Sequence, residues 1–146
     1  MIELARVSSV IDAPVQEVWR LITDFANPQR LAPSIEHCSI IVEGGSEGVG
    51  AVRLVLARGL RIYERLVEAD EVSHRFRYEI LPDGDMPAAG LSSYAAQVLL
   101  SPLSERRTRV EWSSEGDVVG DLVALNTQFQ VLYRSAIERL GLMLSV

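Results

Sequence analysis

The sequence predicts an α+β fold in which an antiparallel sheet is covered by a long C-terminal helix. Apolar residues recur three and four positions apart from about residue 119 to 144, which is typical of an amphipathic helix. Between residues 35 and 114, short alternating segments are separated by Gly, Pro, Asp and Ser, which predicts consecutive strands. Short connections between consecutive strands favour an antiparallel meander. With no repeat or linker in view, residues 1–146 are predicted to form a single domain.

The N-terminal region predicts one strand followed by a helical pair. The stretch "IELARVSSVIDA" alternates as a strand, and "APVQEVWRLITDF" has its apolar residues on one helical stripe. Pro14 suits a first helical position, and Glu17 suits the positive end of the helix. Asn27-Pro28 ends this helix, and "QRLAPSI" allows at most a short second helix.

The middle of the chain predicts six strands joined by turns. The stretch "LPDGDMPAAG" is too long for a tight hairpin and is therefore predicted to be a flexible loop over a site. The expected strands cover residues 35–43, 50–57, 61–70, 74–81, 92–101 and 106–114.

The C-terminal helix must bury its apolar stripe against a long apolar surface, for which the concave face of the sheet is the only candidate. Three residues of this stripe, Phe129, Leu132 and Ala136, are also expected in the wall of a cavity between helix and sheet. The stripe comprises Leu122, Leu125, Phe129, Leu132, Ala136, Leu140 and Met143.

Composition restricts the chemistry. The net charge of −6 disfavours nucleic acid and anionic membranes as partners, and no apolar run is long enough for membrane insertion. All 14 basic residues are arginine, which excludes lysine chemistry, and Cys38 is the sole cysteine. One cysteine and two histidines do not complete a structural zinc site. We expect a cytoplasmic protein, monomeric or homodimeric, without metal or cofactor.

Glu64 conflicts with the pattern around it. It lies between Ile62 and Leu66 on one face of a predicted strand, and burying an unpaired carboxylate costs several kcal/mol. Glu64 is therefore a polar anchor in a cavity, a catalytic acid, or the rim of a solvated sheet.

The motifs resemble those of a known superfamily. "IDAPVQEVWRLITDFANP" resembles the opening of START-like (SRPBCC) proteins, specifically their bacterial polyketide cyclase/dehydrase-type branch, and "GVGAVR", "YERLVEAD", "RYEI", "SSYAAQVLLSP" and "TRVEWSS" follow in the same order. The resemblance implies the helix-grip fold: a curved antiparallel sheet of about seven strands, two short N-terminal helices and a long C-terminal helix enclosing a cavity. It implies one START-like ligand-binding domain over residues 1–146.

The resemblance extends to plant abscisic-acid receptors and implies which residues line the cavity. Strand alternation independently places Phe76 and Tyr78 on one face, but it sends Glu111 to solvent, so the position of Glu111 stays open. Ala96 stands where those receptors have a serine. The implied lining residues are Glu64, Arg53, Tyr78, Tyr94, Ala96 and Glu111.

Three functions are compatible with these residues. The first is binding or carriage of a small hydrophobic or aromatic molecule, with aromatic walls and a few polar anchors. The second is a cyclase or dehydratase in which Glu64 transfers a proton while Tyr94 or Arg53 stabilises an enolate. The third is an interaction module without ligand, with Glu64 and Arg53 as a structural ion pair. Because the sequence offers no securely inward histidine and no lysine nucleophile, binding is favoured over catalysis.

Overall fold

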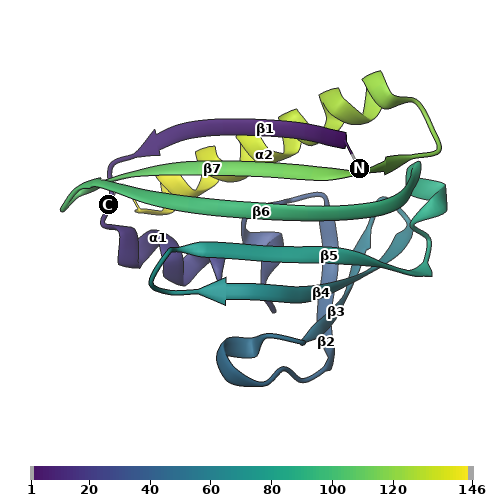
Figure 1. Ribbon diagram of the computed structural model, residues 1–146, viewed down its shortest axis with the longest axis horizontal. Helices are drawn as coiled ribbons and strands as arrows, with labels where there is room; N and C mark the ends of the chain where they lie inside the picture. Colours follow the sequence, from purple (N-terminus) through teal and green to yellow (C-terminus); the bar gives the residue numbers. More distant parts are fainter. Residues whose placement is uncertain (1, 145–146) are drawn as a thin grey trace.

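A computed structural model describes residues 2–144 and shows one curved antiparallel sheet with a long helix against it (Figure 1). The strand order is β1-β7-β6-β5-β4-β3-β2, so that β1 and β2 form the two edges. This confirms the predicted α+β class. The elements are β1 (Ile2–Ile11), α1 (Val15–Ile22), β2 (Ile35–Val42), β3 (Val52–Ala57), β4 (Leu60–Asp70), β5 (Arg75–Gly84), β6 (Leu91–Ser104), β7 (Arg107–Val118) and α2 (Leu122–Leu144).

The strands from β2 to β7 form a meander, each pairing with the next along the chain. The β3–β4 hairpin turns through Arg58 and Gly59, whose φ angles are 53° and 78°. Two successive positive φ angles match the right-handed twist of paired strands, which fixes the register of this hairpin. In that register Arg53 lies directly opposite Glu64.

Helix α2 covers the concave face of the sheet and packs beside β1 and β7 (Figure 1). Its buried residues include Tyr133 and Ile137, which the predicted stripe omitted, whereas the stripe residues Leu122 and Met143 are exposed. Both exposed residues lie in the first or last turns of the helix. The buried stripe therefore comprises Leu125, Phe129, Tyr133, Ala136, Ile137 and Leu140.

Two predicted local features differ from the structure. The second N-terminal helix is only a 3₁₀ turn, η1 (Pro28–Arg30). The predicted loop 81–90 begins later, because β5 continues to Gly84 by pairing with β4. Gly84 has a φ of +75°, and a Cβ there would lie 2.5 Å from the Arg61 carbonyl oxygen, so this close approach needs glycine.

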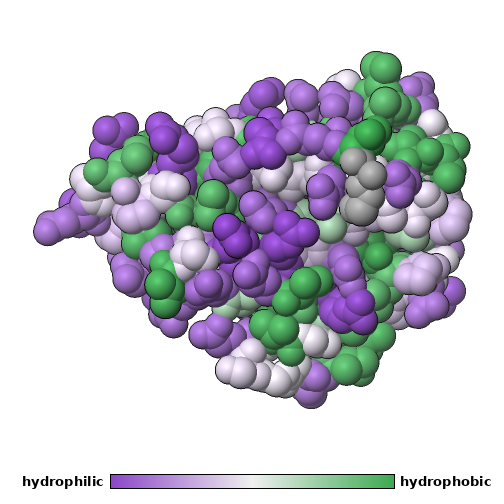
Figure 2. Space-filling view, viewed as in Figure 1, coloured by the Kyte–Doolittle hydropathy of each residue, from purple (hydrophilic) through white to green (hydrophobic). Residues whose placement is uncertain are grey.

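The convex face of the sheet differs from the concave one. Figure 2, seen from the convex side, shows hydrophilic side chains over the central strands. The convex face carries cross-strand ion pairs, such as Arg65–Glu79 between β4 and β5 and Arg6–Glu111 between β1 and β7. Between residues 2 and 144, the helices are too short or too polar to cross a membrane.

Candidate ligand cavity

A cavity of about 210 Å³ lies between the concave face of the sheet, α2 and the segment that follows α1. Aromatic rings form a continuous part of its wall, each in contact with the next, with centroid separations from 5.1 Å (Tyr94–Phe129) to 6.5 Å (Tyr78–Tyr94). The rings of the wall are Phe76, Tyr78, Tyr94, Phe129, Tyr133 and Trp112, and Phe25 continues the series from Phe76 without lining the cavity. The series joins residues from the α1–β2 connection, three strands and α2.

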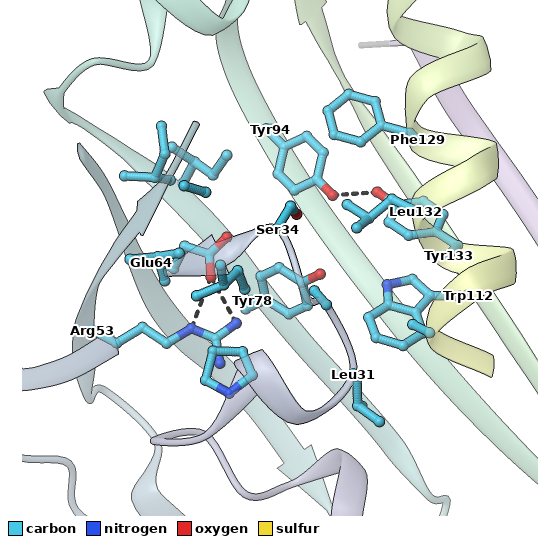
Figure 3. Close-up of a pocket in the computed structure, with 18 of the residues that line it drawn as sticks. Leu31, Ser34, Arg53, Glu64, Tyr78, Tyr94, Trp112, Phe129, Leu132 and Tyr133 are labelled. Carbon is cyan, nitrogen blue, oxygen red and sulfur yellow. Dashed lines mark hydrogen bonds and ion pairs between the residues drawn. The ribbon is translucent and has the colours of Figure 1, made fainter. Parts of the chain in front are cut away.

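Arg53 and Glu64 form an ion pair at one end of the cavity (Figure 3). The Arg53 Nε and Nη2 atoms lie 2.8 and 2.7 Å from Glu64 Oε1, and Nη1 donates to the Phe25 carbonyl oxygen at 2.8 Å. The guanidinium carbon also lies 4.0 Å from the centroid of the Phe25 ring, a cation–π contact. The charge of Arg53 is therefore neutralised, and its guanidinium group is held by Glu64, by the Phe25 carbonyl and by the Phe25 ring.

The two carboxylate oxygens of Glu64 differ: one is paired with Arg53, and the other is available to a ligand. Oε1 receives both contacts from Arg53, whereas no hydrogen bond within residues 2–144 reaches Oε2. Figure 3 shows this second oxygen directed away from Arg53, toward the side of Tyr94. A carboxylate oxygen so placed accepts hydrogen bonds from a ligand hydroxyl or amine.

Phenol hydroxyls gather at the opposite end, where the sheet meets α2. The Tyr94 and Tyr133 hydroxyls are hydrogen-bonded to each other across the cavity wall (Figure 3). Tyr133 is fully buried, and its ring stacks on Trp112 at a centroid separation of 5.5 Å. The Tyr78 hydroxyl completes this group, which we call the phenol cluster: Tyr78, Tyr94 and Tyr133.

The surroundings of the phenol cluster hold two buried polar atoms without a well-formed hydrogen bond. They are the indole nitrogen of Trp112 and the hydroxyl oxygen of Ser114. Trp112 lies beside Tyr78, and Ser114 beside Tyr133. A buried polar group without a partner costs free energy, so these two atoms mark an incomplete polar site.

Burial keeps the phenol cluster protonated. The pKa of Tyr78 is raised to about 12, chiefly by loss of hydration and next by the negative charge of Glu64, while Arg53 opposes the increase. Burial likewise raises the pKa of Tyr94 and of Tyr133 well above the usual value for tyrosine. At neutral pH all three side chains are therefore hydrogen-bond donors and not bases.

Most residues expected at the cavity line it. Beside Arg53 and Glu64, these are the residues of strands β5 and β6 and of α2, namely Phe76, Tyr78, Tyr94, Phe129, Leu132 and Ala136. Ala96 is buried but is not among the residues that line the cavity.

The pocket position for Glu111 that the resemblance implies is wrong. The Glu111 carboxylate pairs with Arg6 on the convex side of the sheet, and its side chain is 31% exposed. Alternation along β7 gives the physical reason, since the neighbouring residue Trp112 faces the cavity. The strand pattern, which sends Glu111 to solvent, thus gives the observed orientation.

The lining residues not predicted from the sequence include two aromatic ones, Tyr133 and Trp112. Tyr133 lies four positions after Phe129 and four before Ile137, so a wider apolar stripe would have included it. Trp112 shares a strand face with Val110, which is fully buried. In both cases the hydrophobic pattern of the sequence does not reveal the polar atom that the aromatic side chain carries.

The arrangement suits binding through hydrogen bonds and apolar contact. Within residues 2–144, no group of three His, Cys, Asp or Glu side chains is placed to hold a metal ion. The cavity instead has an acceptor at Glu64 and donors at the phenol cluster, with apolar walls between them. Such a site orients a small molecule that has polar atoms at two places.

Comparison with known proteins agrees with this architecture. A protein from Nitrosospira multiformis is 28% identical, with a TM-score of 0.74 over 95% of this chain and 94% of that one. The di-domain ARO/CYC BexL from the BE-7585A biosynthetic pathway is 21% identical, with a TM-score of 0.75 over 97% of this chain and 45% of that one. Norcoclaurine synthase from Thalictrum flavum, solved with dopamine and hydroxybenzaldehyde, is 16% identical, with a TM-score of 0.72 over 94% of this chain and 83% of that one. The last two establish a shared fold alone.

The family model described as polyketide cyclase / dehydrase and lipid transport matches residues 4–141, nearly the whole chain. This match is consistent with the curved seven-stranded sheet and with the aromatic cavity under α2. The chain belongs to the polyketide cyclase/dehydrase and lipid transport family.

Proposed function

We propose that this protein binds or carries a small, mostly apolar, uncharged molecule in the cavity under α2. The observation that carries the proposal is that the buried charge of Arg53 is already neutralised: Arg53 pairs with Glu64 and donates to the Phe25 carbonyl. Inside the cavity, an anionic ligand would have to displace Glu64 from Arg53 to gain a counter-charge, because the other arginine of the lining, Arg58, is exposed to solvent. Displacement would leave a buried carboxylate unpaired, at a cost of several kcal/mol.

The size of the cavity supports a ligand of about one substituted ring. An apolar cavity of roughly 150 Å³ accommodates benzene. The cavity here measures about 210 Å³, which leaves room for one or two substituents. The aromatic walls offer ring contacts, and Glu64 Oε2 accepts a hydrogen bond from a donor on the ligand.

Filling the cavity tests this proposal. Leu132 lines the cavity, whereas its neighbour Val131 is 60% exposed on the other side of α2. Calorimetric titration with acetophenone, a neutral single-ring molecule, should show binding to the wild type and to Val131→Trp. Leu132→Trp should abolish binding with little change in melting temperature. Equal binding by both tryptophan variants would show that the probe binds elsewhere and would overturn the proposal. Native mass spectrometry of freshly purified protein would identify a co-purified ligand.

One observation favours a second function, catalysis of proton transfer. The available oxygen of Glu64 faces the side of the cavity where the phenol cluster lies (Figure 3). In this reading Oε2 takes a proton from the carbon next to a ligand carbonyl. The electron pair of that C–H bond forms the C=C bond of an enolate, the π pair of the carbonyl moves to its oxygen, and a phenol hydroxyl stabilises the charge there. The family description includes cyclases and lipid transport together, and so is compatible with both functions.

Hydrogen–deuterium exchange at the acetophenone methyl group distinguishes the two functions. An enolising site should accelerate this exchange in heavy water, measured by proton NMR, and Glu64→Gln should remove the acceleration. Binding of acetophenone without accelerated exchange would exclude proton transfer and leave the carrier function standing.

A further inference from the structure

The phenol cluster lies beside a buried hydrogen-bond donor, the indole N–H of Trp112, that has no well-formed acceptor. Tyr94 and Tyr133 have two phenol protons, but a single contact between their oxygens holds only one of them. The other proton can turn toward a ligand in the cavity or toward the neighbouring oxygens of Tyr78 and Ser114. The indole N–H of Trp112 lies beside Tyr78 but makes no well-formed hydrogen bond, and an indole N–H can only donate.

These donors come from three elements that converge on the cavity wall. Tyr94 lies on β6, Trp112 on β7 and Tyr133 on α2, and all three line the cavity. Figure 3 shows the indole nitrogen on the edge of the Trp112 ring that faces the phenol hydroxyls. The rings are fixed by stacking of Trp112 on Tyr133 and of Tyr133 on Phe129. Donors held in this way are preorganised, so a ligand does not have to order them.

The polarity of this end excludes a charged acceptor. The phenols are neutral, and among residues 2–144 the only cation in contact with them is Arg53, which is already paired. The charge of Glu64 also disfavours a second negative charge nearby. A carboxylate placed here would lose its hydration without a counter-ion. A carbonyl or ether oxygen has no such cost and satisfies the same donors.

We propose that Tyr94, Tyr133 and Trp112 form an acceptor-binding subsite that selects ligands with an uncharged carbonyl or ether oxygen at the α2 end of the cavity. This inference rests on the proposed binding function and adds the ligand's orientation to it. The oxygen acceptor lies against the phenol cluster, and a ligand donor, where there is one, lies at Glu64.

Three single-ring probes of similar shape test the subsite: acetophenone, ethylbenzene without the oxygen, and benzoate with a charge. The double variant Tyr94→Phe/Tyr133→Phe removes both hydroxyls together, so neither is left without its partner. The affinity for acetophenone should decrease about tenfold, the value of one net hydrogen bond, while that for ethylbenzene stays constant or increases. Tyr63→Phe, outside the cavity lining, serves as the control.

Infrared spectroscopy supplies a readout that a structural role would not change. The carbonyl stretch of bound acetophenone should lie at lower frequency in the wild type than in the double variant and in Trp112→Phe. Equal losses of affinity for acetophenone and ethylbenzene, or tighter binding of benzoate than of acetophenone, would overturn the subsite. Failure of all three probes to bind the folded wild type would instead overturn the proposed binding function itself.

Discussion

Glu64 and Arg65 are neighbours on β4, yet they form ion pairs in opposite environments. Glu64 pairs with Arg53, directly opposite on β3, and Arg65 pairs with Glu79, directly opposite on β5. The first pair lies on the concave face, with side chains 7% and 13% exposed, and the second lies on the convex face, with side chains 48% and 33% exposed.

The difference shows that the same cross-strand pairing of charges has different consequences on the two faces. On the convex face, water screens both partners, and such a pair contributes little to stability. On the concave face each charge depends on the other, because burial has removed its hydration. The convex pair keeps the sheet surface polar, whereas the concave pair sets the polarity of the cavity.

The largest expected effect is from breaking the concave pair. Arg53→Met keeps the apolar stem but leaves Glu64 buried without its cation and the Phe25 carbonyl without its donor. The free energy of unfolding, measured by urea denaturation, should decrease by about 3–5 kcal/mol. Arg53→Met/Glu64→Leu should recover most of this loss, because no buried charge remains. A loss below about 1 kcal/mol in the single variant would show that the pair is effectively solvated.

The next effect concerns Tyr78, on the same concave face. The unfolded chain loses the phenol proton near the ordinary pKa of 10, whereas burial raises the pKa to about 12 in the fold. The folded state therefore binds this proton more tightly than the unfolded chain does. The resulting contribution to the free energy of unfolding is fully present below pH 10 and is lost as the pH rises through 12.

Tyr78→Phe should flatten this part of the alkaline stability profile by about 2–3 kcal/mol between pH 10 and 12. Urea denaturation at several pH values measures it, and Tyr63→Phe provides a control outside the cavity. An unchanged slope in Tyr78→Phe would contradict the assignment of a buried, protonated phenol.

A smaller effect is expected on the convex face. Arg65→Met removes a cation from a pair that is partly exposed on both sides, so stability should fall by less than about 1 kcal/mol. Comparison with Arg53→Met in the same denaturation series then measures the difference between the faces directly. Equal losses for the two substitutions would remove the distinction between them.

The smallest effect is the response to salt. Raising the ionic strength from about 0.01 to 1 M shortens the screening length from roughly 30 to 3 Å and weakens exposed pairs most. The stability difference between wild type and Arg65→Met should shrink by a few tenths of a kcal/mol, whereas that between wild type and Arg53→Met should stay constant. A salt-dependent loss in Arg53→Met would indicate that water reaches the concave pair.

The sequence was sufficient for the fold and for much of the cavity. Segment order predicted the sheet and the long helix, because hydrophobic periodicity of two or near 3.6 residues is a local property of the chain. Glu64 could be singled out because a carboxylate between Ile62 and Leu66 breaks a strand pattern. The same alternation gave the correct orientation of Glu111, where the family resemblance did not.

Tertiary structure alone decided which polar atoms meet. Tyr94 and Tyr133 are 39 residues apart, and their hydrogen bond exists only because α2 crosses the concave face at that height. In the sequence, Trp112 and Tyr133 look like ordinary apolar packing residues. Hydrophobic periodicity indicates the face on which a side chain lies, but not the hydroxyl group that it contacts there. The direction of Glu64 was determined by the sequence, whereas its partner, its available oxygen and the donors at the other end of the cavity were determined by packing.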